Sequence, residues 1–295
     1  MPTVRAATRG SPLARWQAEH VGALLRAVDP DVTVELVVVD TVGDRRLDVP
    51  IWELGGKGVF AKEVQAAVLD GRADIAVHSA KDLPSVGVPG LVLAAVPERG
   101  DPRDALVGGT LADLPQGAEV GTGSLRRRVE LLRHRPDLRF ASLRGNMQTR
   151  IAKAVEHDAV VVAAIALDRL GLGDHIAERL STDTMLPQVA QGALAVECRA
   201  DDVDLRLLVS RIEHPPSRRC VDAERAFLAE LGGDCLLPAG AHAVLDGEAL
   251  HLRAFLASPD GRTMLRTAIE GPGPAIGADA ARELRARGGP ALLDG

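Results

Sequence analysis

The sequence EVGTGSLRRRVELLRHRPDLRFASLRGNMQTR, residues 119–150, contains two basic turns. In the first, Val120 runs into Gly121-Thr122-Gly123-Ser124 and then into an arginine-rich amphipathic segment. The second, Leu143-Arg144-Gly145-Asn146, follows another short apolar stretch. A strand that delivers a Gly/Ser/Thr turn to a helix start exposes backbone N–H groups, and these favour bound anions together with the helix dipole. The stretch therefore predicts an anion-binding strand–turn–helix unit.

The arginines of this stretch indicate which anions it binds. Guanidinium groups form forked hydrogen bonds to carboxylates or phosphates, and four suitable ones are Arg126, Arg127, Arg144 and Arg150. Three successive helical residues fan over roughly 200°, so at most two of residues 126–128 can serve one site. A lone arginine triplet is more often a solvated helix face, and that alternative stays open. The second basic turn favours one wall of a polyanion site.

Composition limits the class of protein. The 295 residues suggest two or three domains. A net charge of −6 and an aromatic content of 2% argue against a nucleic-acid binder, which needs basic and stacking surfaces. Because the sequence shows no signal-like segment and no apolar run of membrane-spanning length, we expect a cytoplasmic protein without a membrane partner.

Cysteine and histidine spacing adds two further expectations. The three cysteines Cys198, Cys220 and Cys235 are far apart, which is typical of a reducing cytosol without disulfides. The eight histidines show no ligand-like spacing, so we expect no metal. Cys235 follows Gly232-Gly233-Asp234 with no histidine base near it in the sequence. Spacing alone favours an inert thiol, whereas a thiol exposed in a cationic cleft would be a nucleophile.

Strand and helix patterns predict an α/β fold. Ser11 is the expected cap of a helix from Pro12 to Val28. Alternating strands and helices predict parallel βαβ units with sites at the carboxyl ends of the strands. The expected strands are residues 3–8, 32–39, 73–77, 91–96, 138–141 and 159–163. Pro215-Pro216 is interpreted as a boundary. After it we expect a helix at 217–231, two or three strands within 242–269 and a last helix near 275–287.

We divide the chain into three domains. Domain 1 is discontinuous and comprises 1–97 plus 190–212, domain 2 is 98–189, and domain 3, a small α+β unit, is 213–295.

Two loops near the predicted site have alternative interpretations. Asp82, before Leu83-Pro84, is most often a turn residue. Beside Lys81 in an arginine-lined cleft it would stay ionised and stabilise a cation or relay protons. The run Gly55-Gly56-Lys57-Gly58 is not a P-loop, because Gly rather than Ser or Thr follows Lys57. We interpret it as a flexible, lid-like loop.

Several motifs, in order over nearly the whole chain, resemble the hydroxymethylbilane synthase family, also called porphobilinogen deaminases. They are ATRGSPLA (7–14), GGKG (55–58), ADIAVHSAKD (73–82), VGTGSLRR (120–127), LRGNMQTR (143–150) and Cys235 after its glycines. The resemblance implies three domains. The first two would resemble type II periplasmic binding protein lobes around a cleft, and the third would be an α+β domain that carries the cysteine loop.

The resemblance also implies a reaction and a cofactor. Four porphobilinogens are joined head to tail with loss of ammonia, and water then frees hydroxymethylbilane for porphyrin and haem biosynthesis. A dipyrromethane cofactor would be attached to Cys235 through a thioether, in a monomer. The alternative from another class is a cytosolic two-lobed anion-binding or effector-sensing module, which would need the arginines but neither Asp82 nor Cys235.

Position in these motifs implies the roles of single residues. Asp82 would be the catalytic carboxylate, close to developing positive charge. The cofactor carboxylates would be held by Lys81, Thr122, Ser124, Arg126, Arg127, Arg144 and Arg150. Incoming substrate would be held by Arg9, Ser11, Gln17, Arg144, Arg150 and Arg169. Each pyrrole carries an acetate and a propionate, so the growing chain explains basic clusters in an acidic protein.

Four positions depart from the usual family pattern. Asp234 stands where a small residue is common, and its charge would slow thiolate formation at Cys235. Val42 replaces a frequent basic residue, Ala190 replaces a usual Gly, and Asp168 puts a negative charge beside Arg169.

Overall fold

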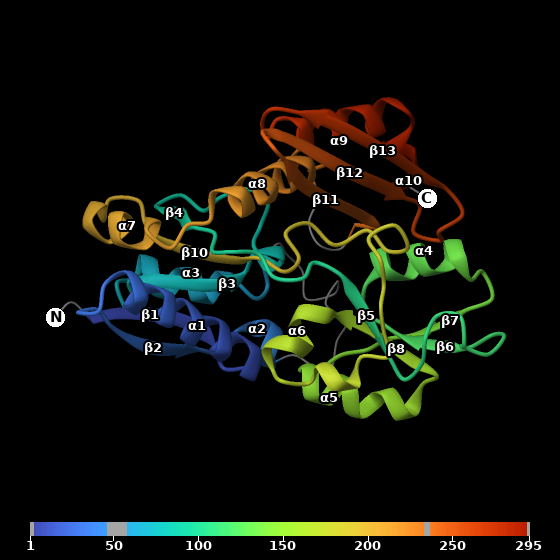
Figure 1. Cartoon of the computed structure of the whole chain (residues 1–295), viewed down its shortest axis with the longest axis horizontal. Coiled ribbons are helices and arrows are strands. Elements are labelled where there is room, and N and C mark those ends of the chain that lie inside the picture. The colour runs from blue at the N-terminus through green and yellow to red at the C-terminus, as the bar shows by residue number, and fades with distance from the viewer. Residues whose placement is uncertain (1–2, 46–57, 233–236, 294–295) are drawn as a thin grey trace. The chain divides into compact units, whose positions relative to one another are not determined.

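The computed structural model describes residues 3–45, 58–232 and 237–293. Its internal contacts divide the chain into two compact units, whose helices and strands are labelled in Figure 1. Unit 1 comprises Met1–Gly100 and Ala193–Arg218, and unit 2 comprises Asp101–Gly192 and Arg219–Gly295. Unit 2 contains two separate sheets. It takes in most of both expected domains 98–189 and 213–295, so the three-domain division stays a prediction.

Unit 1 is built on a five-stranded sheet of order β2-β1-β3-β10-β4. β1 is parallel to β2 and β3, as expected, whereas β10 is antiparallel to β3 and β4. β10 thus runs against its neighbours, since it starts at Leu194 opposite Ser79, the last residue of β3. The elements are β1 (Thr3–Arg9), α1 (Pro12–Val28), β2 (Thr33–Val39), α2 (Val42–Arg45), α3 (Lys62–Leu69), β3 (Ile75–Ser79), η2 (Ala80–Asp82), β4 (Leu91–Ala95), β10 (Leu194–Arg199) and α7 (Val203–Ser210).

Capping and aliphatic packing explain how this unit forms. Ser11 caps α1 as expected, since its Oγ accepts from the Ala14 N–H at 3.3 Å, and Pro12 supplies the preset φ of a first helical residue. The buried face of α1 packs on one side of the sheet, where Leu25 and Ile75 belong to one aliphatic core. A second core with α3 covers the other face. The carboxyl ends of β1 and β3 are thus held between two packed layers.

Unit 2 contains a sheet of order β7-β6-β8-β5-β9. β6 is parallel to β7 and β8, while β5 runs antiparallel to β8 and β9. The elements are β5 (Asp104–Val107), β6 (Glu119–Gly121), α4 (Leu125–His134), β7 (Arg139–Ala141), α5 (Met147–Ala152), η3 (Lys153–Glu156), β8 (Ala159–Ala163), α6 (Ala164–Arg169), η4 (Gly173–His175) and β9 (Glu178–Arg179).

The remaining part of unit 2 is an antiparallel sheet, β11-β12-β13, packed against helices. Its elements are α8 (Pro215–Glu230), β11 (Ala239–Asp246), β12 (Ala249–Ala257), β13 (Met264–Gly271), α9 (Ile276–Ala286) and α10 (Gly289–Leu293). The expected boundary at Pro215-Pro216 lies close to the division between the two units after Arg218, and the two prolines form the first turn of α8, where a missing N–H costs nothing. Helix α10 was not predicted. Within the described residues, no helix has the length and apolar character needed to span a membrane.

Candidate active site

A pocket of about 50 Å³ in unit 1 lies at the carboxyl ends of β1 and β3. Arg9 is the last residue of β1, Ser11 and Gln17 come from the cap and first turns of α1, and Asp82 ends η2. These four predicted residues line the pocket together. The strand–turn–helix pattern therefore assembles the predicted catalytic carboxylate and predicted substrate contacts at one edge of the sheet.

The pocket residues are fixed by contacts from neighbouring elements. Gln17 is buried, and its Nε2 donates to Ser79 Oγ at 2.9 Å, which joins α1 to the end of β3. The Arg9 guanidinium carbon lies 4.1 Å from the centre of the Phe60 ring, a cation–π contact. Ala80 N–H donates to Ala193 O at 3.0 Å and ties η2 to the start of β10. The half-buried Lys81 and Asp82 follow on this anchored turn.

A buried polar cluster in unit 1, not foreseen from the sequence, adjoins this pocket. His78, which also lines the pocket, has its Nε2 3.2 Å from Glu197 Oε2. Gln65 Nε2 donates to the same oxygen at 2.8 Å. All three side chains are buried. No sequence pattern could have revealed this cluster, because its residues lie on β3, β10 and α3 with no common spacing.

In unit 2 the two basic turns lie side by side. β6 and β7 are parallel neighbours with Gly121 opposite Ala141, and Thr122 N–H donates to Ala141 O at 2.9 Å. A Cβ at Gly123 would lie 3.1 Å from Leu143 O, so the backbones approach closely. The predicted anion-binding turns therefore share one edge of one sheet.

Each turn caps its helix in the way its sequence predicts. Ser124 Oγ accepts from the Arg127 N–H at 3.4 Å, and Asn146 Oδ1 accepts from the Thr149 N–H at 2.9 Å. Gly145 has φ 114°, and a Cβ there would lie 2.8 Å from Thr149 Cγ2, so only glycine fits. Arg150 Nε donates to Gly145 O at 2.9 Å, which folds this side chain back over the turn.

Arg126 and Arg127 are buried and converge on Asp104. Arg126 Nη2 lies 2.7 Å from Asp104 Oδ2, and Arg127 Nε and Nη2 lie 3.0 and 2.8 Å from Oδ1. Arg128 instead lies over the Phe140 ring at 5.7 Å. As expected from helical geometry, two of the three arginines point to one place. They do not form a solvated face, since Arg126 is 2% and Arg127 7% exposed.

Sequence reasoning missed Asp104, because a carboxylate at the start of a short strand looks like a turn residue. Burial would raise the pKa of Asp104, but the charges of Arg126 and Arg127 outweigh it and lower the pKa to about 2. Burial also lowers the pKa of Arg127. Asp104 is therefore ionised, and the cluster holds two cations for one carboxylate.

Arg169, the last residue of α6, is tied to the backbone. Its Nη2 donates to Gly192 O at 2.8 Å, and burial lowers its pKa to about 10. The neighbouring carboxylate of Asp168 accepts from Arg179 Nη2 at 2.7 Å and Nη1 at 2.9 Å. The negative charge that the sequence places beside Arg169 is thus taken up by another arginine.

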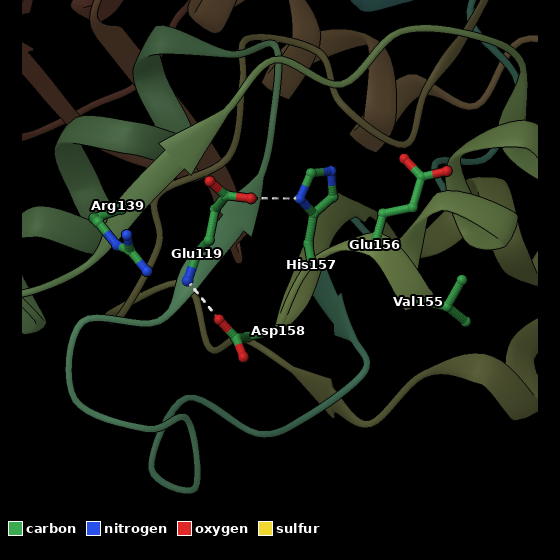
Figure 2. Close-up of a pocket in the computed structure, with 6 residues that line it drawn as sticks. All are labelled: Glu119, Arg139, Val155, Glu156, His157 and Asp158. Carbon is green, nitrogen blue, oxygen red and sulfur yellow. Dashed lines mark hydrogen bonds and ion pairs between the residues drawn. The ribbon is translucent and has the colours of Figure 1, made fainter.

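A larger hollow, of about 360 Å³, lies in unit 2 at the amino ends of β6 and β7, opposite the two basic turns (Figure 2). Glu119 and Arg139, the first residues of β6 and β7, line it with His157 and Asp158. Glu119 Oε1 is 2.8 Å from His157 Nδ1, and the backbone N–H of Glu119 donates to Asp158 Oδ2 at 2.7 Å. None of the predicted site residues lines this hollow.

Several predicted features fall outside the described residues: Cys235, Asp234 and the run 55–57. Val42, another departure, begins α2, and its N–H donates to Glu63 Oε1 at 3.0 Å. Among the described residues, no group of three or more His, Cys, Asp or Glu is arranged to hold a metal ion.

Fold and sites together define an α/β protein with two arginine-rich turns side by side at one edge of a sheet. Residues 4–207 match the family model described as porphobilinogen deaminase, dipyromethane cofactor binding domain, and residues 218–286 match the porphobilinogen deaminase C-terminal domain. The chain belongs to the porphobilinogen deaminase family.

Full-length relatives agree with this assignment. The porphobilinogen deaminase of Syntrophomonas wolfei subsp. wolfei is 46% identical over 301 residues, which cover 99% of this chain and 98% of that protein. That of Geobacter sulfurreducens is 46% identical over 297 residues, which cover 98% and 93%. The solved structure of the methionine-binding protein MetQ overlaps 71% of this chain and 89% of its own, with a TM-score of 0.46 at 11% identity.

The described residues fit the dipyrromethane cofactor that the family model names. Such a group carries carboxylates, and the cluster of Arg126, Arg127 and Asp104 has one cation in excess. The buried Arg126 Nε also finds no hydrogen-bond partner within the described part of the chain. An incoming carboxylate would supply both the missing charge and an acceptor.

Proposed function

We propose that this protein joins four porphobilinogen molecules head to tail onto a dipyrromethane primer, with loss of ammonia, and then releases hydroxymethylbilane by hydrolysis. Family membership supports this reaction. The observation that carries it is the unit 1 pocket, where Arg9, Ser11, Gln17 and Asp82 meet. The comparisons lend no support to a non-catalytic anion-binding module.

The pocket residues would divide binding from chemistry. Arg9 and Ser11 would hold the acetate and propionate of the incoming pyrrole by charge-assisted hydrogen bonds. Gln17, oriented by Ser79, would contact its polar edge. The Asp82 carboxylate would stabilise the positive charge that develops as ammonia leaves, and it would accept the proton released when the new carbon–carbon bond restores the pyrrole ring.

The two basic turns would hold the cofactor. Bound through Cys235, the dipyrromethane supplies the primer ring to which the first substrate unit is joined. Its carboxylates would be held by Lys81, Thr122, Ser124, Arg126, Arg127, Arg144 and Arg150, and the last two arginines would also contact substrate with Arg169. Arg126 and Arg127 together carry one more charge than Asp104 offsets, and this excess positive charge supports the role of unit 2 in binding the cofactor.

Intact mass and turnover together test the proposed function. Purified protein should exceed the mass of its bare sequence by two pyrrole units and should convert porphobilinogen to hydroxymethylbilane. A protein whose mass matches the bare sequence, and which binds porphobilinogen without consuming it, would instead be an anion-binding module.

We also propose that the protein acts as a cytoplasmic monomer without nucleic-acid or membrane partners. The acidic net charge and the family resemblance support this. Light scattering coupled to size exclusion should give 31.0 kDa for the chain, and a value twice as large would contradict it.

A further inference from the structure

Asp104 is the meeting point of four donors in unit 2. It begins β5 opposite Ala163, the last residue of β8, and it is fully buried. Its oxygens accept from Arg126 and Arg127, and its Oδ1 also accepts from Gln191 Nε2 at 3.0 Å. Both oxygens of Asp104 therefore accept hydrogen bonds, and these bonds orient the guanidinium planes of Arg126 and Arg127.

The far ends of the two guanidinium groups are also held. Arg126 Nη1 donates to Leu186 O at 2.7 Å, and Arg127 Nη1 donates to Val161 O at 3.1 Å. Each side chain is thus fixed at two points, and neither needs a ligand to order it. A preordered arginine loses little conformational freedom when an anion binds.

Charge adds a second argument. Two adjacent buried guanidinium groups repel each other, and without a counterion each would carry a large desolvation cost. Asp104 offsets one of the two charges and leaves the other. A second fixed carboxylate would cancel the attraction for an anionic ligand, and no carboxylate would leave the pair unstable. A single fixed carboxylate therefore stabilises the two buried arginines and still leaves them able to attract a ligand carboxylate.

Gln191 holds Asp104 in turn. Its Nε2 donates both to Asp104 Oδ1 and to Pro102 O at 2.7 Å, so the amide bridges the strand start and the residues before it. Gln191 carries no charge, and its replacement would loosen Asp104 without altering the charge count.

We propose that Asp104, with Gln191, is a positioning residue for cofactor attachment: it orients Arg126 and Arg127 and leaves the pair one unit of positive charge for a ligand carboxylate. The inference rests on the proposed function. The alternative is that Asp104 only stabilises the fold, as a buried bridge between β5 and α4.

The rate of cofactor attachment separates these alternatives. Full-length protein produced without porphobilinogen is mixed with porphobilinogen well below its unfolding temperature, and the covalent adduct is followed by intact mass. Asp104→Asn should slow attachment by about tenfold or more, because a misdirected charge-assisted hydrogen bond loses much of its strength, and it should raise the half-saturating porphobilinogen concentration. Gln191→Met should slow attachment by about threefold. Asp137→Asn, which breaks an Arg–Asp pair elsewhere in unit 2, is the control and should attach at the parent rate.

The outcomes are distinct. A lower unfolding temperature in Asp104→Asn with attachment at the parent rate would show a purely structural role and overturn the inference. If Asp104→Asn does not fold, Gln191→Met decides, and attachment at the parent rate in that variant overturns the inference. A parent protein that forms no adduct would overturn the proposed function as well, which sets that failure apart.

Discussion

Ala190 N–H donates to Glu224 Oε2 at 2.6 Å, and the other oxygen of this buried carboxylate accepts from Ala243 N–H at 2.8 Å. Ala190 has φ 59°, the only positive φ of a non-glycine residue in the described part of the chain. Glu224 thus helps to hold a strained backbone and joins it to α8 and β11. The family's usual glycine at this position would adopt this φ without a Cβ clash.

Ala190→Gly should therefore stabilise the protein. Relief of the left-handed strain contributes about 1–2 kcal/mol, and the greater freedom of unfolded glycine takes back about 0.4–1 kcal/mol. The midpoint of urea unfolding should rise. Ala281→Gly, at a buried position of α9, should lower it, and a fall of equal size in both variants would show that Ala190 is unstrained.

Gly277→Ala should destabilise unit 2. A Cβ at Gly277 in α9 would lie 1.8 Å from Ala223 O in α8, so the two helices would have to separate. Overpacking of this kind costs about 1–3 kcal/mol, measured by urea unfolding. Gly273→Ala meets no atom within 4 Å and should change stability little. Equal stability of the two variants would mean that α8 and α9 yield without cost.

Asp82→Asn should retain the cofactor and lose turnover. The change keeps the size of the side chain but removes its charge, and loss of one such stabilising group costs about 10²–10³ in rate. Asp82→Glu keeps the charge and should retain more activity. Single-turnover measurements on adduct-bearing protein decide this, and a rate for Asp82→Asn near that of the parent would leave Asp82 a turn residue.

Cys235→Ser should fold without the adduct, whereas Cys198→Ala and Cys220→Ala should keep it. Burial raises the pKa of Cys198 to about 11, so its thiolate is scarce at neutral pH, and Cys220 is buried in α8. Intact mass checks all three variants. An excess of two pyrrole units on Cys235→Ser would move the attachment site to another residue.

The stability of the parent should fall in acid through Asp104. Its folded pKa of about 2 lies below the ordinary 3.8, so its contribution is complete above pH 3.8 and is lost as the pH falls towards 2. The full contribution is roughly 2 kcal/mol. Urea midpoints between pH 5 and pH 2.5 should therefore fall less steeply in Asp104→Asn than in the parent. Identical slopes would mean that Asp104 titrates normally.

Local chemistry made much of the fold predictable. Ser11 before Pro12 identified the start of α1, and the turn 121–124 identified the start of α4. These signals depend only on neighbouring residues. Strand direction depends on pairing between distant segments, so the sequence could not show that β5 and β10 run antiparallel to their neighbours.

The arginines of the candidate site could be predicted from the sequence, but the carboxylate that orients them could not. Arg126 and Arg127 follow a readable turn, whereas Asp104, 22 residues before Arg126, reaches them only through the pairing of β5 with β8. His78 and Glu197 meet by the same kind of long-range pairing. A buried counterion is set by tertiary contacts, so one sequence alone does not reveal it.

The place of β10 governs the order in which the chain can fold during synthesis. β10 lies between β3 and β4, and among the described residues it is the only strand paired with β4. The first hundred residues therefore leave the ribosome with β3 unpaired on one side and β4 detached. The strands of the β7-β6-β8-β5-β9 sheet all come from residues 104–179, so that sheet can close while the earlier strands wait. An exposed strand edge invites wrong pairing, so the time needed to synthesise residues 101–199 is the interval in which the nascent chain most needs protection from aggregation.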